Sequence, residues 1–371
     1  MSAHASAAHA PAARATTALS PALADLCAAE YPGLPAGYLN AATHALAPAR
    51  TVTALRGALD SWAAGRPDTG GYEVAVADAR AALARITGVP LSQVALAGTV
   101  AGGVGLIAAA LPPGAEVVAY QEDFSSLVHP FAARTDLRLR LVPLQDLADA
   151  VRPGTALVAV SAAQSADGRV ADLAAIRAAA AAHGARTLLD ATQAIGWLPI
   201  DAGDYDYVVC HGYKWLVSPH GACFLTIRPG AESTLSPAFT GWYGADDPWA
   251  SCYGPVAELA PGARRFDARP AYLAYVGAAA SLSLIEEIGV PAIHAHDLAL
   301  ADRLRDGFTA LGYDPVPGRS AIVAVPAVPQ AVHQRLTEAG VAFSARAGNL
   351  RFAPHFYNTP ADVDLALAAA G

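Results

Sequence analysis

The sequence predicts an α/β protein with a mainly parallel sheet that carries helices on both faces, followed by a smaller C-terminal α+β domain. The first observation is that short runs rich in β-branched residues alternate with alanine-rich helical stretches, a pattern typical of strand–helix–strand units. The second is that these runs are largely apolar instead of alternating with polar residues, as strands buried on both faces are. The predicted strands are 116–120, 155–161, 185–191, 205–210 and 222–228.

The helical stretches and the C-terminal part complete this arrangement. Residues 170–184 predict a helix between two strands, with Gly184 as its C-cap. Residues 94–114 are uncharged but contain five glycines, which predicts a strand, a glycine-rich turn and a buried helix instead of a membrane span. The helical stretch 270–289 opens the C-terminal part, where 321–326 predicts a further strand. We therefore expect a tail (1–20), a large domain (21–269) and a small domain (270–371).

Composition and charge exclude several classes of protein. Of the 371 residues, 54% are hydrophobic and 15% are charged, so a large buried core is readily built. The net charge of −8 and the lack of a basic run argue against a nucleic-acid partner. The four cysteines are irregularly spaced, which predicts a reducing, cytoplasmic compartment and neither a disulfide framework nor a zinc site. Residues 1–20 lack the basic start and apolar core of a signal peptide, and we expect them to be disordered.

Polar residues gather where two neighbouring predicted strands end. Asp190 ends one strand, and Gln193 follows it closely; the next strand delivers His211, Tyr213 and Lys214 to the same edge of the sheet. One interpretation is structural, a buried ion pair between Asp190 and Lys214. The other is chemical: a desolvated lysine forms a Schiff base, the aspartate keeps a pyridinium nitrogen protonated, and the glutamine bonds the ring oxygen. The lysine, aspartate and glutamine together indicate a Schiff-base site more specifically than any one of them alone.

A phosphate site is predicted upstream, in residues 96–108. Small residues and the hydroxyl of Thr99 lie there at an expected helix N-terminus, where backbone N–H groups and the helix dipole favour an anion. Residues 103–108 also fit the dinucleotide fingerprint G-x-G-x-x-[GA], with Asp123 downstream, which is the mark of a nicotinamide enzyme. The preceding strand is expected to end well before this match, however, and a dinucleotide leaves Lys214 unexplained.

Two further stretches follow predicted strands. Phe124, in residues 122–131, is placed where an aromatic ring can lie against a flat cofactor, although an ordinary core position is the alternative. Ser165 and Gln164, in residues 161–168, offer polar contacts at the end of a strand. Taken alone, neither stretch identifies a site.

Together these motifs resemble the class V aminotransferase superfamily of pyridoxal-phosphate enzymes, which includes cysteine desulfurases, kynureninases and isopenicillin-N-epimerase-like proteins. The similarity runs from "YLNAATHALAP" (38–48) to "LRFAPHFYNT" (350–359), and its specific core is "LLDATQAIGWLPID" followed by "HGYKWLVSPHG". The stretches "DFSSLVHPF" and "HFYNT" are most similar to the branch with the epimerase-like proteins and ergothioneine-type C–S lyases. The resemblance implies the fold type I of pyridoxal 5'-phosphate (PLP) enzymes, PLP as cofactor, a small amino-acid substrate, and a homodimer with shared active sites.

The resemblance also implies a role for each site residue. Lys214 forms the internal Schiff base and moves the proton at the substrate Cα, and Arg351 binds the α-carboxylate; a solvated surface arginine is the alternative for the latter. Trp242, in residues 239–249, belongs to a loop that touches the phosphate in the partner subunit. The implied cofactor contacts are Asp190 at the pyridine nitrogen, Gln193 at the ring hydroxyl, Phe124 stacked on the ring, Ser165 as a further polar contact, and Thr99, the Val100 backbone, His211 and Tyr213 at the phosphate.

The chain departs from the family pattern in two places. The usual "GP(R/K)G" turn is here "SPHG" (218–221), so a contact on the phosphate side or within the turn differs. Desulfurases carry a nucleophilic cysteine far downstream of the lysine, whereas no cysteine follows Cys252, so sulfur transfer through a persulfide is excluded.

The two histidines in 293–297 are two residues apart and lack a third ligand, and no metal site is predicted.

The preferred reaction is that of an amino-acid lyase of the C–S, β-eliminating type. An aminotransferase and an epimerase of the same superfamily are the alternatives. An epimerase needs a second acid/base, for which Tyr357, His355 and His44 are candidates by position only. A nicotinamide-dependent dehydrogenase and a non-catalytic relative without cofactor remain as remote alternatives, and the joint presence of the lysine, aspartate and arginine argues against the second.

Overall fold

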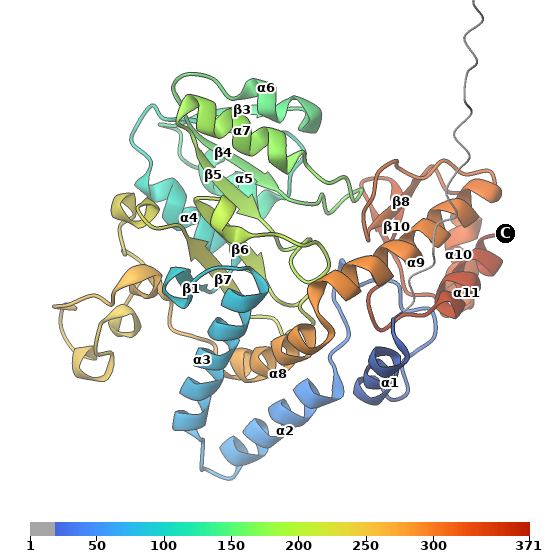
Figure 1. The fold of residues 1–371 in the computed structure, drawn as a ribbon, viewed down its shortest axis with the longest axis horizontal. Coiled ribbons are helices and arrows are strands. Elements are labelled where there is room, and N and C mark those ends of the chain that lie inside the picture. Colours follow the sequence, from blue (N-terminus) through green and yellow to red (C-terminus); the bar gives the residue numbers. More distant parts are fainter. Residues whose placement is uncertain (1–18) are drawn as a thin grey trace, which may run out of the picture.

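The computed structural model describes residues 19–371, which form a large sheet with helical layers and a smaller unit at the C-terminal end (Figure 1). The disordered tail predicted for residues 1–20 therefore lies, except for its last two residues, outside the described part of the chain. The helices are α1 (Pro21–Glu30), α2 (Ala49–Ala63), α3 (Thr69–Ile86), α4 (Val100–Ala110), α5 (Ser125–Ala132), α6 (Leu147–Ala150), α7 (Leu173–His183), α8 (Tyr272–Ile288), α9 (Val290–Ala310), α10 (Gln330–Glu338) and α11 (Pro360–Ala370). The strands are β1 (Val94–Ala97), β2 (Glu116–Tyr120), β3 (Arg138–Val142), β4 (Thr155–Ser161), β5 (Arg186–Asp190), β6 (Tyr207–His211), β7 (Cys223–Ile227), β8 (Val323–Pro326), β9 (Ser344–Arg346) and β10 (Asn349–Phe352).

The large sheet has seven strands in the order β1-β7-β6-β5-β4-β2-β3. Strands β3, β2, β4, β5 and β6 pair in parallel, while β7 runs antiparallel to both of its neighbours. The five strands predicted from apolar runs are confirmed as β2, β4, β5, β6 and β7. The sequence prediction missed β3, because this strand at the edge of the sheet has the mixed sequence "RLRLV" with no fully buried residue.

Helices cover both faces of this sheet, as predicted. Successive residues of a strand point to opposite faces. In β4, for example, Val158 and Val160 pack with α3, α7 and α8, whereas Leu157 and Ala159 pack with α4 and α5. The predicted helix cap is confirmed at Gly184, whose φ of 67° is left-handed. The predicted strand and buried helix in residues 94–114 are likewise present as β1 and α4.

The smaller unit holds a three-stranded antiparallel sheet in the order β8-β10-β9, packed with α9, α10 and α11. The segment before α2 reaches this unit, because Tyr38 and Asn40 form isolated bridges with Ala342 and Ala353. The buried apolar side chains of α8 instead belong to the hydrophobic cluster of the large sheet. In α9, the buried residues from Leu300 onward belong to the cluster of the small sheet. The division at residues 269 and 270 therefore stays a prediction.

Within residues 19–371 no single helix has the length and apolar character needed to cross a membrane. The consecutive helices α8 and α9 pass that test only as a pair, and the pair is bent by 81°.

Candidate active site

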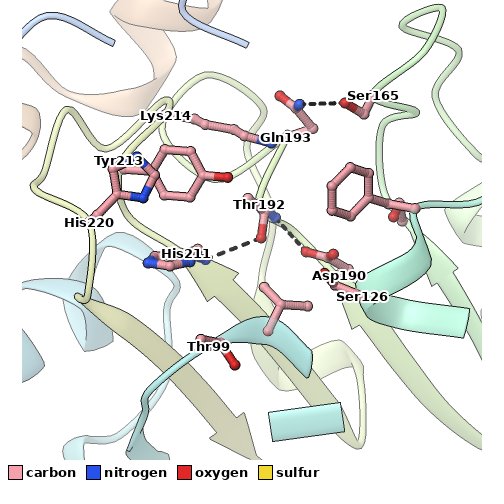
Figure 2. A pocket seen from close by; sticks show the side chains of 13 residues that line it. Thr99, Ser126, Ser165, Asp190, Thr192, Gln193, His211, Tyr213, Lys214 and His220 are labelled. Atoms are coloured by element: carbon pink, nitrogen blue, oxygen red, sulfur yellow. Dashed lines mark hydrogen bonds between the residues drawn. The ribbon is translucent and has the colours of Figure 1, made fainter. Parts of the chain in front are cut away.

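A cavity of about 200 Å³ opens where β4, β5 and β6 end and α4 begins (Figure 2). Parallel strands of an open α/β sheet bring their carboxyl ends to one edge, and that edge is where ligands bind in such folds. The cavity is lined by Thr99, Val100, Phe124, Ser126, Ser161, Ser165, Asp190, Thr192, Gln193, His211, Tyr213, Lys214 and His220. Every cofactor residue predicted from the sequence therefore lines one cavity, with the exception of Trp242.

Lys214 is the only lysine in the chain and lies in the turn that follows β6. It is 5% exposed and makes no side-chain hydrogen bond or ion pair with any residue from 19 to 371. Its Nζ lies 5.5 Å from the centroid of the Phe124 ring and 5.4 Å from that of the Tyr213 ring. Burial lowers the pKa of this amine to about 8, and the positive charges of Arg351 and Arg346 act in the same direction, against the attraction of Asp190.

The turn that carries Lys214 is anchored through its neighbour Trp215, which is completely buried. The indole Nε1 of Trp215 donates to Gln193 Oε1 at 2.9 Å, and its carbonyl oxygen lies 3.0 Å from His355 Nε2. A lysine on a turn fixed at both the side chain and the backbone of the next residue has little freedom to leave the cavity.

Asp190, at the end of β5, faces the same cavity, but it is not an ion-pair partner of Lys214. No oxygen of its carboxylate comes within 4.0 Å of the lysine nitrogen, and one oxygen accepts the Thr192 backbone N–H at 2.9 Å. Burial raises the pKa of Asp190, and the nearby Asp123 carboxylate adds to this effect. The buried ion pair considered from the sequence is therefore absent, and both groups are available to a ligand.

Arg351, on β10, lies directly behind the cavity wall and is 1% exposed. Its guanidinium donates to Ser344 Oγ at 3.0 Å, to Thr43 Oγ1 at 2.7 Å, and to the carbonyl and hydroxyl oxygens of Ser165. No carboxylate of residues 19–371 pairs with it, and burial lowers its pKa to about 10 with help from Arg346. The alternative of a solvated surface arginine is wrong, because this side chain is a buried cation without an anion.

The amide of Gln193 is already engaged by protein groups. Its Nε2 donates to the carbonyl of Ala42 at 2.9 Å and to Ser165 Oγ at 3.0 Å, while Oε1 accepts from Trp215. Because both amide hydrogens are used, Gln193 can donate a hydrogen bond to a ring hydroxyl only if one of these two hydrogen bonds is broken. That role remains a prediction.

One end of the cavity is suited to an anion. Thr99 caps α4 by accepting the Gly102 N–H at 3.0 Å, and Thr99 and Val100, at the N-terminus of this helix, both line the cavity. His211 Nε2 accepts the Gly221 N–H at 3.1 Å, so the ring proton of the neutral form is on Nδ1. Burial lowers the pKa of His211 to about 4, with His220 and Lys214 contributing, so the ring is a neutral donor.

The comparison with protein families shows the family to which this fold belongs. The model of the family "Aminotransferase class-V" matches residues 38–364. The chain belongs to the class-V aminotransferase family. The members of this family are PLP-dependent enzymes of fold type I, so the resemblance expected from the sequence is confirmed.

The sequences and structures most similar to this class-V enzyme include several activities. It is 27% identical over 300 residues to an uncharacterized aminotransferase of Bacillus subtilis, covering 76% of this chain and 79% of that protein. It is 28% identical over 326 residues to the isopenicillin N epimerase of Streptomyces clavuligerus, covering 77% and 81%.

Two solved structures share the fold. The complex of the cystine C–S lyase C-DES with cysteine persulfide matches with a TM-score of 0.81 at 22% identity, over 91% of this chain and 98% of the other. The cysteine desulfurase CsdA of Escherichia coli matches with a TM-score of 0.81 at 20% identity, over 93% and 97%. At these identities the two structures establish the fold only.

The cavity of this class-V enzyme fits PLP by its own chemistry. It combines an amine that forms no hydrogen bond or ion pair with residues 19–371, a buried carboxylate, and a helix N-terminus that favours an anion. It also presents Phe124, which begins α5 and is 47% exposed despite its large apolar ring. An aromatic face that is left open to a cavity is the surface on which a flat heteroaromatic ring stacks.

Several lining residues were not predicted from the sequence. Ser126, Ser161 and Thr192 are small hydroxyl residues with no pattern that separates them from other serines and threonines of the chain. His220 was noted only as a departure from the family turn. In the structure its ring stacks on Tyr213 with centroids 3.8 Å apart, and its Nε2 lies 3.1 Å from His44 Nδ1.

The three candidates for a second acid/base have different surroundings. His355 is completely buried, with Nδ1 2.7 Å from Asp297 Oδ2, and Tyr357 is 4% exposed. Neither residue lines the cavity. His44 does not line the cavity itself but contacts two residues that do, His220 and Tyr213.

Trp242 lies outside the cavity, in a short helix (Trp242–Gly244), where it packs on Trp249 and under the guanidinium of Arg269. Its role in a partner's active site stays a prediction. Cys210 and Cys223 are buried core residues, and no cysteine of residues 19–371 lines the cavity. No group of three potential metal ligands occurs within the same residues.

Proposed function

We propose that this class-V enzyme is an amino-acid lyase that breaks a C–S bond at Cβ of its substrate by β-elimination. The observation that supports the proposal most is Lys214, a buried amine with no hydrogen-bond or ion-pair partner among residues 19–371 and a pKa lowered to about 8, in one cavity with Asp190. Such an amine is neutral in a substantial fraction of molecules near neutral pH and can accept a proton.

Different residues of the cavity would bind different parts of the cofactor and the substrate. Asp190 would pair with the pyridine nitrogen, Phe124 would stack on the ring, and the N-terminus of α4 with His211 and Tyr213 would hold the phosphate. When bound, PLP supplies an electron sink for the pair released at the substrate Cα. Arg351 would bind the α-carboxylate, because its fork pairs with no carboxylate of residues 19–371.

In this proposal Lys214 removes the Cα proton from the substrate. The Cβ–S bond then breaks and the electron pair leaves with sulfur, which takes up a proton to give a thiol. Water hydrolyses the remaining enamine to pyruvate and ammonia. Sulfur transfer to a protein thiol is not part of the proposal, because no cysteine of residues 19–371 lines the cavity.

An aminotransferase and an amino-acid epimerase remain the alternatives, since proteins with these names are among the relatives at 27% and 28% identity. The test is to incubate the PLP-loaded protein with a cysteine S-conjugate and to measure pyruvate, ammonia and thiol. Equal amounts of the three products support the lyase, and Lys214→Ala should abolish them. Amine transfer that depends on a keto acid and releases no ammonia would establish the aminotransferase. Loss of optical activity without pyruvate would establish the epimerase.

The proposal includes a homodimer with shared active sites in a cytoplasmic compartment. Its support is a group of large aromatic side chains exposed to solvent in residues 239–253: Phe239 is 70% exposed, Trp249 64% and Tyr253 95%. A second copy of the chain is the occupant that would bury them. Light scattering on the purified protein tests this, and a Tyr253→Glu, Phe239→Glu double variant should shift the mass to that of a monomer.

A further inference from the structure

A short hairpin beside the cavity carries a second arginine. Strands β9 and β10 are joined by Ala347 and Gly348, whose φ angles of 46° and 79° are both positive, as a tight two-residue hairpin turn requires. The register pairs Ser344 with Arg351 and Arg346 with Asn349. Because directly paired residues of antiparallel strands point to the same face, and so do residues two apart, Arg346 shares the face of Arg351.

This face is directed at the cavity, as the contacts of Arg351 establish. Its guanidinium bonds Ser344 on the hairpin and Ser165 on the cavity wall. On the opposite face of the hairpin, Leu350 is buried in the core of the small unit. Arg346 therefore lies at the tip of the hairpin, on the same face as Ser344 and Arg351, through which the hairpin contacts the cavity wall.

Arg346 is exposed and has no acidic partner in residues 19–371; its guanidinium bonds only the carbonyl of the adjacent Ala345. Its charge nevertheless acts on the site, since it contributes to lowering the pKa of both Lys214 and Arg351, in which burial is the largest cause. Arg346 and Arg351, neither of which pairs with a carboxylate of residues 19–371, therefore place two positive charges on the face of the hairpin next to Lys214.

We propose that Arg346 binds a second anionic group of the substrate, so that the preferred substrate is an amino acid whose side chain ends in a carboxylate beyond Cβ. This inference rests on the proposed function, in that Arg351 holds the α-carboxylate of the same molecule. A guanidinium fork pairs with a carboxylate through two parallel hydrogen bonds, and an exposed tip residue can reorient to follow a flexible side chain.

The test compares two cysteine S-conjugates of equal shape, S-carboxymethylcysteine and its neutral isostere S-carbamoylmethylcysteine. Binding is read from the change in the visible spectrum of the PLP-loaded protein, and pyruvate is measured in parallel. We expect wild type to bind the carboxylate ligand more tightly. Arg346→Gln should weaken that ligand roughly tenfold and the neutral one less than about twofold. Arg346→Lys should recover part of the loss, and added salt should reduce the preference.

The matched control is Arg138→Gln, which removes the same charge from the exposed first residue of β3, an edge strand of the large sheet, whereas Arg346 belongs to the small sheet. Equal losses for both ligands in Arg346→Gln, or an equal loss in the control, would overturn the assignment. So would a weakened affinity of the variant for PLP itself, because Arg346 would then serve the cofactor phosphate.

The two proposals fail in different ways. If the carboxylate preference is present and depends on Arg346 but no pyruvate forms, the lyase is refuted and the substrate class stands. If pyruvate forms from both ligands with equal affinity, the lyase stands and the role of Arg346 is refuted.

Discussion

The burial of Lys214 makes a prediction about stability that does not depend on the reaction. Its pKa falls from 10.5 to about 8 in the folded protein. At about 1.36 kcal/mol per pH unit this corresponds to a penalty of about 3 kcal/mol for carrying the charged amine in the cofactor-free protein. The unfolded chain binds more protons than the folded one between these two values, so stability rises with pH from about 8 to 10.5 and the penalty is fully present below 8.

Replacing this residue by a neutral side chain of similar shape should therefore stabilise the cofactor-free protein. We expect Lys214→Met to raise the free energy of unfolding at pH 7 by about 2–3 kcal/mol. The gain should shrink steadily as the pH is raised through 8 toward 10.5. The measurement is urea-induced unfolding of both proteins after PLP has been removed, at pH 7 and at pH 9.

The pKa itself can be measured independently, because Lys214 is the only lysine in the chain. Its rate of reaction with a small acylating reagent, followed by peptide mass spectrometry, should rise with pH through a midpoint at about 8 and level off before pH 10. A variant no more stable than wild type at pH 7, or a gain that does not depend on pH, would refute the reasoning. An acylation profile that still rises at pH 10 would refute it as well.

Three further substitutions test the surroundings of the cavity. Arg351→Lys keeps the charge but loses the fork, and should weaken amino-acid binding roughly 10- to 100-fold in spectral titrations while PLP stays bound. Gly196→Ala places a Cβ 2.3 Å from the Trp215 carbonyl oxygen at a φ of 114°, and should cost about 2–4 kcal/mol of unfolding free energy and impair PLP binding. Thr99→Val removes the cap of α4 and should cost about 1 kcal/mol with weaker PLP retention, measured by dialysis; unchanged retention would count against a phosphate site there.

The sequence by itself determined the sheet, apart from its edge strand β3, and most of the cavity wall. Strands buried on both faces are continuous apolar runs, and the polar residue that ends such a run, as Asp190 does, must lie at the carboxyl edge of the sheet. Residues adjacent in sequence to a strand end therefore become neighbours in space, which is why Lys214, Thr99 and Phe124 could be assigned to one site.

Only the tertiary structure decided what each group contacts. Asp190 and Lys214 form no ion pair, and the carboxylate instead accepts the Thr192 N–H, a contact that no spacing in the sequence predicts. Arg351 lies far along the chain from Ser165, and only the docking of the small sheet brings them together and leaves the guanidinium without an anion. The role proposed for Arg346 rests on the register of a two-residue hairpin, where a shift by one residue would turn its side chain to the other face.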